Sequence, residues 1–407
     1  MEMKILDNEN KNNTPLSFES LYDSITGSFS ALRIVRKLNP AGGKGTKVYP
    51  PSYSEGKYAF EDRIIDDRLV STVILDSVQS QANRMEEALL RAYRKGDLLF
   101  PLIEMRLPDG VTGNGRITTL EVPHRIADAI FRESELEGVD FRLSKVGKAF
   151  ANSNIGNATG LLNYCPQALI FGIWDSTGSK GGLGNKFSRA IVSEIVGINA
   201  KQGVQTSSRL DPLVHYGHKI IRTDKGEWKL SNGEKEEKSE SKAKISEINL
   251  GNVTPTLERE KFGGVTIDHA IQTIVLSLPS LRRLHFPFNG EETEKNNNYS
   301  RTLLVSMSLA AIMYMMDEGY DLRSRCLLVP AGDVVLEIIA NNGSITQYSI
   351  SKDISRKIFN EGVLKIKEIG IPWPEEPIVV YPNARLRSVI ENELEIQTGV
   401  FSDETNN

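Results

Sequence analysis

The chain has 407 residues, of which 39% are hydrophobic and 25% are charged. This balance is typical of a globular protein with one large core or two to three domains, and it excludes a fibrous or fully disordered chain. Because 49 Lys and Arg residues face 53 Asp and Glu residues, the formal net charge is -4 at pH 7. No overall positive field attracts nucleic acid, so any site for a polyanion must be local.

Two further features bound the cellular context. Cys165 and Cys326 lie far apart with no CxxC spacing, which argues against a disulfide framework or a structural zinc site and fits a reducing cytoplasm. Residues 1–17 are polar and lack the apolar core of a signal peptide, so we expect a flexible lead and no export. The apolar segment 302–316 is too short to span a bilayer and predicts a buried helix, with no membrane partner.

The first elements of the chain are two strands and a helix. Residues 30–38 and 68–75 have the β-branched, partly alternating character of strands, and a Pro- and Gly-rich loop at 39–56 follows the first. Residues 76–95 predict a helix, because apolar residues recur on one face at spacings of three to four. A strand candidate follows at 98–107.

The middle of the chain centres on a glycine-rich loop. A helix is expected to begin near Pro123, and residues 168–174 read as a buried strand. The loop at 178–184 comes next, and residues 185–197 are expected to form a helix behind it.

The segment 200–264 differs in character from its surroundings. Residues 216–222 and 227–230 predict a hairpin, and the charged low-complexity run at 231–244 predicts partial disorder. We therefore expect a protruding insertion.

Regular patterning returns after the insertion. Residues 266–286 predict a helix with a break at Pro279, a polar linker follows at 289–298, and Ser300 caps the apolar helix. Beyond it, the sequence predicts three strands and a helix, at 326–329, 334–340, 345–350 and 353–369. Strands and helices mix without steady alternation, which predicts an α+β sheet domain with long insertions.

Positive charge gathers locally in residues 33–57, which hold six basic residues against Glu55 alone, a balance of +6 − 1 = +5. Tyr49, Tyr53 and Tyr58 interleave with the lysines, as in surfaces that stack the bases of a single strand. Tyrosines that pack the core or the loop are an equal alternative.

The glycine-rich loop is a second candidate contact with phosphate. Gly178, Gly181, Gly182 and Gly184 allow close approach of main-chain N–H groups, and basic residues accompany them. The alternative is a mobile turn with ordinary surface lysines.

Other groups suited to phosphate, sugar or base edges are scattered along the chain. The full set of predicted RNA-binding residues is Arg36, Lys37, Lys44, Lys47, Gln79, Asn83, Arg84, His124, Asn152, Asn154, Lys180, Lys186, Arg189 and Arg209.

Catalytic, metal and cofactor sites have weak support. His215 and His218 would need a third ligand to hold a metal, and the glycine loop lacks the order of a nucleotide-hydrolysing loop. The carboxylates between Asp62 and Asp67 are better explained as a solvated turn. We expect no catalytic residue, no metal and no cofactor.

Five blocks in order resemble the backbone subunit of type I-G (formerly type I-U) CRISPR Cascade complexes, of the RAMP superfamily. They are LDSVQSQANRMEEAL, EVPHRIADA, LIFGIWDSTGSKGGLGNKFSRAIVSEIVG, SSRLDPL and LSLPSLRRLHFP. The combination is specific, although no single block is.

The resemblance implies an RRM-like palm on a ferredoxin-type antiparallel sheet, with finger-like and thumb-like insertions. The palm would comprise residues 18–199 and 265–407, with the thumb at 200–264 and a finger-like loop at 39–56. Copies would polymerise head to tail along CRISPR RNA, with other Cascade subunits, and present the guide to target DNA in the cytoplasm.

Two other classes stay open. One is a ribonuclease of the same superfamily, which would use His124 or an aspartate from the 62–67 turn. The other is a nucleotide-binding enzyme that uses the glycine loop.

Overall fold

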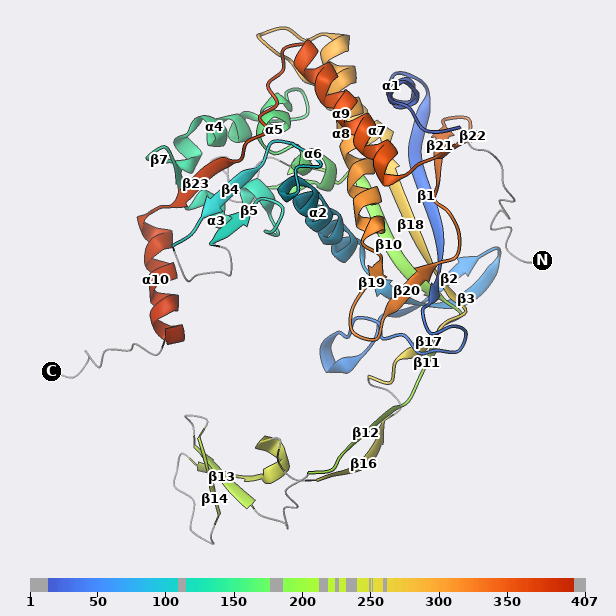
Figure 1. Ribbon diagram of the computed structural model, residues 1–407, viewed down its shortest axis with the longest axis vertical. Coiled ribbons are helices and arrows are strands. Elements are labelled where there is room, and N and C mark those ends of the chain that lie inside the picture. Colours follow the sequence, from blue (N-terminus) through green and yellow to red (C-terminus); the bar gives the residue numbers. More distant parts are fainter. Residues whose placement is uncertain are drawn as a thin grey trace, which may run out of the picture.

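A computed structural model describes residues 14–108, 115–175, 186–211, 219–223, 227–231, 240–248, 250, 252–258 and 262–398. Figure 1 shows a large sheet with helices beside it, a smaller lobe at the side and an arm that projects away from both.

The large sheet has the strand order β19-β20-β1-β18-β10-β3-β2, and β21 pairs with both β1 and β22. Neighbouring strands pair antiparallel throughout the described sheet. Its strands are β1 (Phe29–Pro40), β2 (Phe60–Ile65), β3 (Arg68–Asp76), β10 (Ile191–Ile198), β18 (His269–Ser277), β19 (Tyr320–Asp321), β20 (Leu327–Pro330), β21 (Val335–Ala340) and β22 (Ile345–Ser349).

One face of this sheet forms the core. Along β18 burial alternates residue by residue, so that Ala270, Ile274 and Leu276 point to the buried face. Leu32 and Ile34 of β1 are buried on the same side of the sheet.

Helices cover the buried face. They are α1 (Phe18–Thr26), α2 (Val78–Arg94), α7 (Leu278–Arg282), α8 (Glu294–Asp317) and α9 (Lys352–Glu368). α8 packs against α1, α2 and α9, and residues 300–316 are buried on every side of the helix. An apolar surface all around α8 is therefore consistent with a central position.

The smaller lobe carries its own sheet, in the order β5-β4-β23-β6-β7. β23 comes from the end of the chain and pairs parallel with β4. The elements of this lobe are β4 (Ile103–Arg106), β5 (Arg116–Thr118), α3 (Ala129–Arg132), β6 (Ser134–Leu136), β7 (Val139–Asp140), α4 (Lys145–Asn152), α5 (Thr159–Tyr164), α6 (Gln167–Phe171), β23 (Ile378–Pro382) and α10 (Ala384–Thr398). The short hairpin of β8 (Ile173–Trp174) and β9 (Lys186–Phe187) then leads to β10.

The arm is built from paired strands and leaves the large sheet after β10 (Figure 1). β11 (Lys201–Gln202) pairs with β17 (Val265–Thr266) at its base, and β12 (Gln205–Arg209) pairs with β16 (Val253–Glu258) along its length. A small sheet of β13 (Lys219–Thr223), β14 (Trp228–Leu230) and β15 (Glu240–Lys244) forms the far end.

The structure confirms the α+β class and the antiparallel sheet. Strands β1, β3, β21 and β22 and helices α2 and α9 lie where the sequence predicts them, within a few residues. The predicted hairpin is present as β13 and β14, whereas residues 240–244 of the charged run form a strand instead of a disordered segment.

Two predicted helices are wrong, because both segments are central strands. Residues 186–187 and 191–198 form β9 and β10, and residues 269–277 form β18. Both sequences are rich in β-branched residues and apolar on two faces, a pattern that a short window cannot distinguish from a buried helix.

Smaller corrections concern element type and boundaries. The strand expected at 168–174 is mostly helix α6, and the helix expected from Pro123 consists of a 3-10 turn at Arg125–Ala127 and the short α3. The polar linker at 289–298 already contains the start of α8, capped by Thr293 instead of Ser300.

The expected flexible lead ends earlier than residue 17. Leu16 is buried and donates its N–H to the Ser349 carbonyl, while residues 1–13 lie outside the described part of the chain.

Candidate nucleic-acid interface

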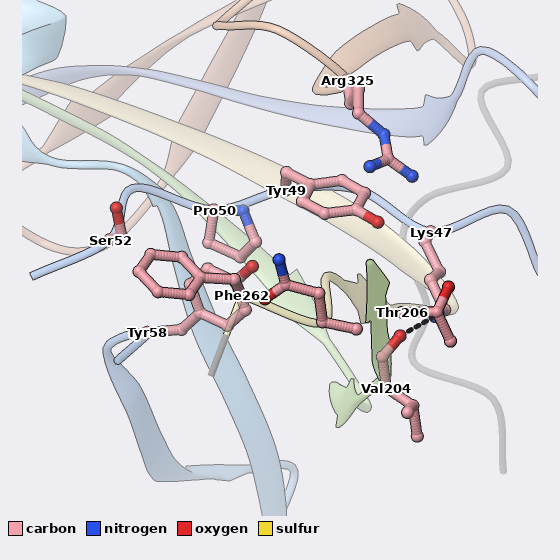
Figure 2. A pocket seen from close by; sticks show the side chains of 10 residues that line it. Lys47, Tyr49, Pro50, Ser52, Tyr58, Val204, Thr206, Phe262 and Arg325 are labelled. Carbon is pink, nitrogen blue, oxygen red and sulfur yellow. Dashed lines mark hydrogen bonds between the residues drawn. The ribbon is translucent and has the colours of Figure 1, made fainter. Parts of the chain in front are cut away.

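A groove of about 460 Å³ lies at the base of the arm. Three segments form its walls: the loop after β1, the base of the arm, and the turn before β20 (Figure 2). The lining residues are Lys47, Tyr49, Pro50, Ser52, Tyr58, Val204, Gln205, Thr206, Phe262 and Arg325. A second hollow of about 330 Å³ shares Lys47 and Arg325 with it.

Main-chain hydrogen bonds fix the loop to the other two segments. Val48 and Val265 exchange N–H···O bonds, each of 2.8 Å, which join the loop to the base of the arm. The Tyr49 N–H donates to the Arg325 carbonyl at 3.1 Å. The groove is therefore held by backbone as well as by side chains.

Arg325 stacks on Tyr49, with the guanidinium carbon 3.7 Å from the ring centroid. The Arg325 side chain makes no ion pair with any described residue, and its backbone has a left-handed φ of 62°. A guanidinium on an aromatic face retains donors for phosphate, and the planar pair offers a surface for a base.

Gly264 allows the Tyr49 ring to approach the backbone. A Cβ at this position would lie 2.9 Å from ring atoms, and its φ of +69° also favours glycine. The Gly264 N–H donates to the Tyr58 hydroxyl at 3.0 Å. Burial raises the pKa of Tyr58, so the phenol stays neutral at neutral pH.

Lys47 joins the loop to the arm on the other side of the groove. Its ammonium donates to the Val204 carbonyl at 2.9 Å. Since this bond uses one of three ammonium donors, the remaining two can meet an anion. Cations and aromatic rings thus share one groove, a combination suited to single-stranded nucleic acid.

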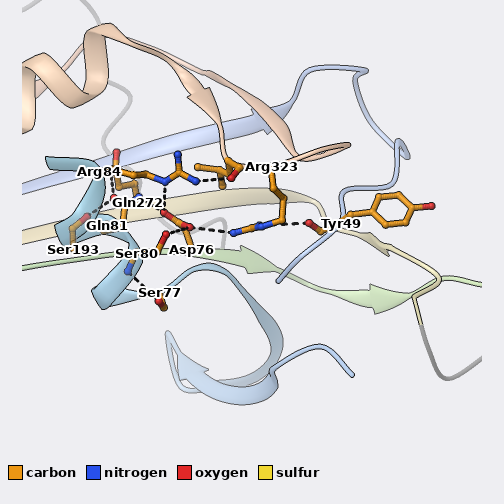
Figure 3. A network of polar contacts seen from close by, with 10 residues as sticks. Tyr49, Asp76, Ser77, Ser80, Gln81, Arg84, Ser193, Gln272 and Arg323 are labelled. Atoms are coloured by element: carbon orange, nitrogen blue, oxygen red, sulfur yellow. Dashed lines mark hydrogen bonds and ion pairs between the residues drawn. The ribbon is translucent and has the colours of Figure 1, made fainter. Parts of the chain in front are cut away.

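A buried network lies behind the groove and is centred on Asp76 (Figure 3). Its carboxylate accepts hydrogen bonds from Ser80 (2.8 Å), Gln81 (2.6 Å), Arg84 (2.9 Å) and Arg323 (3.1 Å). Two cations and two neutral donors satisfy a carboxylate that is not exposed at all.

Arg323 connects this network to the groove. One of its nitrogens lies 3.1 Å from Asp76, and another donates to the Tyr49 carbonyl at 3.5 Å. The network therefore supports the backbone of the residue on which Arg325 stacks.

Of the predicted contact residues, Lys47 lines the groove, and Lys44 is exposed in the loop that bounds the second hollow. Arg84 is paired with Asp76, and Arg36 donates to the Tyr320 hydroxyl, so the side chains of both contribute to the fold. Lys37 is exposed on β1.

Other predicted residues lie on separate surfaces. Gln79 and Asn83 are exposed on α2. His124 is exposed before the 3-10 turn, while Asn152 and Asn154 are exposed at the end of α4. The structure does not bring these five residues into the groove.

The glycine loop region is only partly described. Lys180 and residues 178–184 lie outside the described residues, as do His215 and His218, whereas Lys186 is exposed on β9. Arg189 is half-buried and donates to the carbonyls of Phe171 and Val78. Burial, together with Arg125, lowers the pKa of Arg189.

Arg209 lies on β12 of the arm and donates to the Leu250 carbonyl at 2.9 Å.

Sequence reasoning missed several residues that line the groove, above all Arg325, Phe262, Gln205 and Thr206. Arg325 is separated from Tyr49 by 276 positions, and no local motif marks it. Its left-handed backbone and its stacking arise only once the sheet has formed.

The carboxylates considered for catalysis lie apart from the groove. Asp66 and Asp67 form the two-residue turn between β2 and β3, both with positive φ, and Asp62 is exposed on β2. Within the described ranges, no three His, Cys, Asp or Glu side chains are grouped closely enough to hold a metal ion. Over the same ranges, none of the helices has the length and hydropathy needed to cross a membrane.

Comparison with known proteins gives one family match. Residues 32–202 match the family described as CRISPR-associated protein GSU0053, which is less than half of the chain. No curated protein matches the sequence. The crystal structure of Thermofilum pendens Csc2 aligns over 97% of this chain and 95% of that chain, with 12% identity and a TM-score of 0.27. A TM-score this low does not establish a shared fold.

Proposed function

We propose that the chain is a non-catalytic backbone subunit of a type I-G CRISPR effector complex that binds the guide RNA. The observation behind this proposal is the groove at the base of the arm, which combines cations with aromatic rings inside the region that resembles a CRISPR-associated family.

The chemistry of the groove favours RNA over a small ligand. Arg325 and Lys47 supply charge for phosphates, Tyr49 supplies a ring for a base, and Gln205 and Thr206 supply neutral donors and acceptors for sugars. None of these groups reads a complete base edge, which suits a protein that leaves sequence recognition to base pairing.

The remaining parts of the proposal concern assembly. Copies would associate head to tail through unlike surfaces, and such contacts extend as an open helix along the RNA in the cytoplasm. The palm would be residues 18–199 and 265–407, and the arm at 200–264 would act as the thumb that interrupts base stacking. Partners would be CRISPR RNA, other Cascade subunits and, through the guide, target DNA.

The proposal is tested by measuring guide RNA affinity for Tyr49→Ala and Arg325→Ala. Loss of one stacking partner or one phosphate contact should weaken binding about tenfold, for any RNA sequence of equal length. Electron microscopy of the protein co-expressed with its CRISPR RNA should show a helical assembly of set length.

Arg283→Ala is the matched control, since Arg283 is exposed and bonds only Ser280 among the described residues. It should bind as the wild type does. Equal affinity for all three variants would contradict the groove as the RNA site, and cleavage of the bound RNA would contradict a non-catalytic role.

A further inference from the structure

An exposed tryptophan lies away from the groove, on the hairpin that leads into β10. Trp174 of β8 is 57% exposed, while the adjacent Ile173 and Phe187 side chains are buried. Trp174 is directly opposite Lys186 in the hairpin register. Since neighbouring side chains alternate between faces, Ile173 and Phe187 point inward, and Trp174 and Lys186 point to solvent.

The indole is held in place by a rigid base. Arg125 donates to the Gly172 carbonyl at 2.9 Å and to both carboxylate oxygens of Glu86 on α2, at 2.6 and 2.7 Å. All three residues are buried. A large aromatic side chain is thus fixed at the surface without being used for packing.

Cations surround the ring. The Lys186 ammonium is 5.8 Å from the Trp174 ring centroid and makes no ion pair with a described residue. Arg142 lies 3.8 Å from the carboxylate of Asp175, the residue next to Trp174. The ten residues between Asp175 and Lys186 include one lysine and no acidic residue.

We infer that Trp174 and Lys186 form a second stacking site, which takes a base and an adjacent phosphate of single-stranded nucleic acid. The inference rests on the proposed function, because it takes RNA as the ligand. An indole with an ammonium beside it provides a π-face for any base and a charge for the backbone. A protein partner would also use the indole, but the local excess of cations favours a polyanion.

The placement of the two sites fits one strand of RNA. Lys186 lies a few residues before β10 begins, and Val204 to Thr206 of the groove lie a few residues after it ends. The eight residues of β10 span about 26 Å. A strand of several nucleotides that contacts both ends would be gripped twice by one subunit.

The test uses tryptophan fluorescence and single-stranded oligoribonucleotides. The chain has three tryptophans, of which Trp373 is 5% exposed and Trp228 is 46% exposed. In a Trp228→Phe background, fluorescence changes on binding report mainly on Trp174. We expect quenching by oligo(U) but little by an abasic strand of equal length, because only the former can stack.

Affinity measurements complete the test. Trp174→Ala should weaken oligo(U) binding about tenfold, and Trp174→Phe should retain most of it. Leu143→Ala is the control, because Leu143 is 61% exposed and neighbours Arg142 but offers no ring. Unchanged affinity for Trp174→Ala with no quenching would overturn the inference. An equal loss on the abasic strand, or a Trp174→Ala defect only in self-association without RNA, would also overturn it. Failure of the wild type to bind any RNA would instead overturn the proposed function.

Discussion

At the scale of single residues, Asp76 shows how a polar network supports the groove. Its carboxylate is fully buried, and the side chains of Arg84 and Arg323 that pair with it are 30% and 27% exposed. The same Arg323 reaches the Tyr49 carbonyl. Removing the charge of Asp76 would leave two cations without their counterion and loosen the backbone on which Arg325 stacks.

Asp76→Asn should therefore lower the free energy of unfolding by about 2–3 kcal/mol, less than for a pair fully shielded from water. Urea denaturation measures this change. Asp317→Asn is the control, since the Asp317 side chain is 54% exposed and pairs with Lys352 at the surface. It should change the free energy by less than about 1 kcal/mol. Similar values for the two variants would show that the network is not a structural support.

At the scale of elements, the arm contributes to the groove more than to the core. Its described apolar residues Ile220 and Ile221 are buried within the arm and are separate from the main hydrophobic cluster. The two strands of its base meet closely, because a Cβ on Gly203 would lie 2.6 Å from the Gly263 carbonyl oxygen. The arm can therefore be removed at a point where the chain ends already touch.

Replacing residues 204–262 by two glycines should change the free energy of unfolding by about 1 kcal/mol or less, because a long loop is exchanged for a short one. RNA affinity should fall at least tenfold, since Val204 to Thr206 and Phe262 are lost from the groove wall. Replacing only residues 211–252 is the control, as it retains the β12–β16 ladder. Equal loss of affinity in both variants would assign RNA binding to the far end of the arm.

The elements also show where sequence patterns are informative. Helix α2 and strand β1 were predictable, because each shows one apolar face and one polar face at the spacing of its type. The central strands β10 and β18 were not, because side chains on both of their faces are at least partly buried and the alternation is weak in the sequence.

The groove divides in the same way. Lys47, Tyr49 and Tyr58 were found from the local mixture of basic and aromatic residues. Arg325 and Phe262 come from segments more than 200 positions away along the chain, and only the pairing of β1 with β18 and β20 brings those segments near the loop. Local composition cannot encode such a contact.

At the scale of the whole molecule, binding of a polyanion has to overcome a net charge of -4. Surface charges farther apart than about 10 Å are largely screened at 0.1 M salt, so the cations near the groove can act almost independently of the acidic remainder. The acidic remainder would then limit non-specific association of copies with one another and with other nucleic acids.

RNA affinity should consequently fall steeply with salt despite the negative net charge. Each phosphate neutralised on a single strand contributes about -0.7 to the slope of log K against log salt, so contacts from Lys44, Lys47 and Arg325 give a slope of at least about -2. Lys47→Gln should flatten the slope by about 0.7, as measured by fluorescence anisotropy over a range of KCl concentrations.

Lys365→Gln provides the comparison for this slope, because Lys365 lies on α9 and is paired with Glu368 at 3.1 Å. Its removal should leave the slope unchanged, since no phosphate is expected at that surface. If Lys365→Gln and Lys47→Gln flatten the slope equally, the RNA responds to the total charge of the protein and not to a local site. A slope near zero for the wild type would mean that neutral contacts hold the RNA, and phosphate binding in the groove would be excluded.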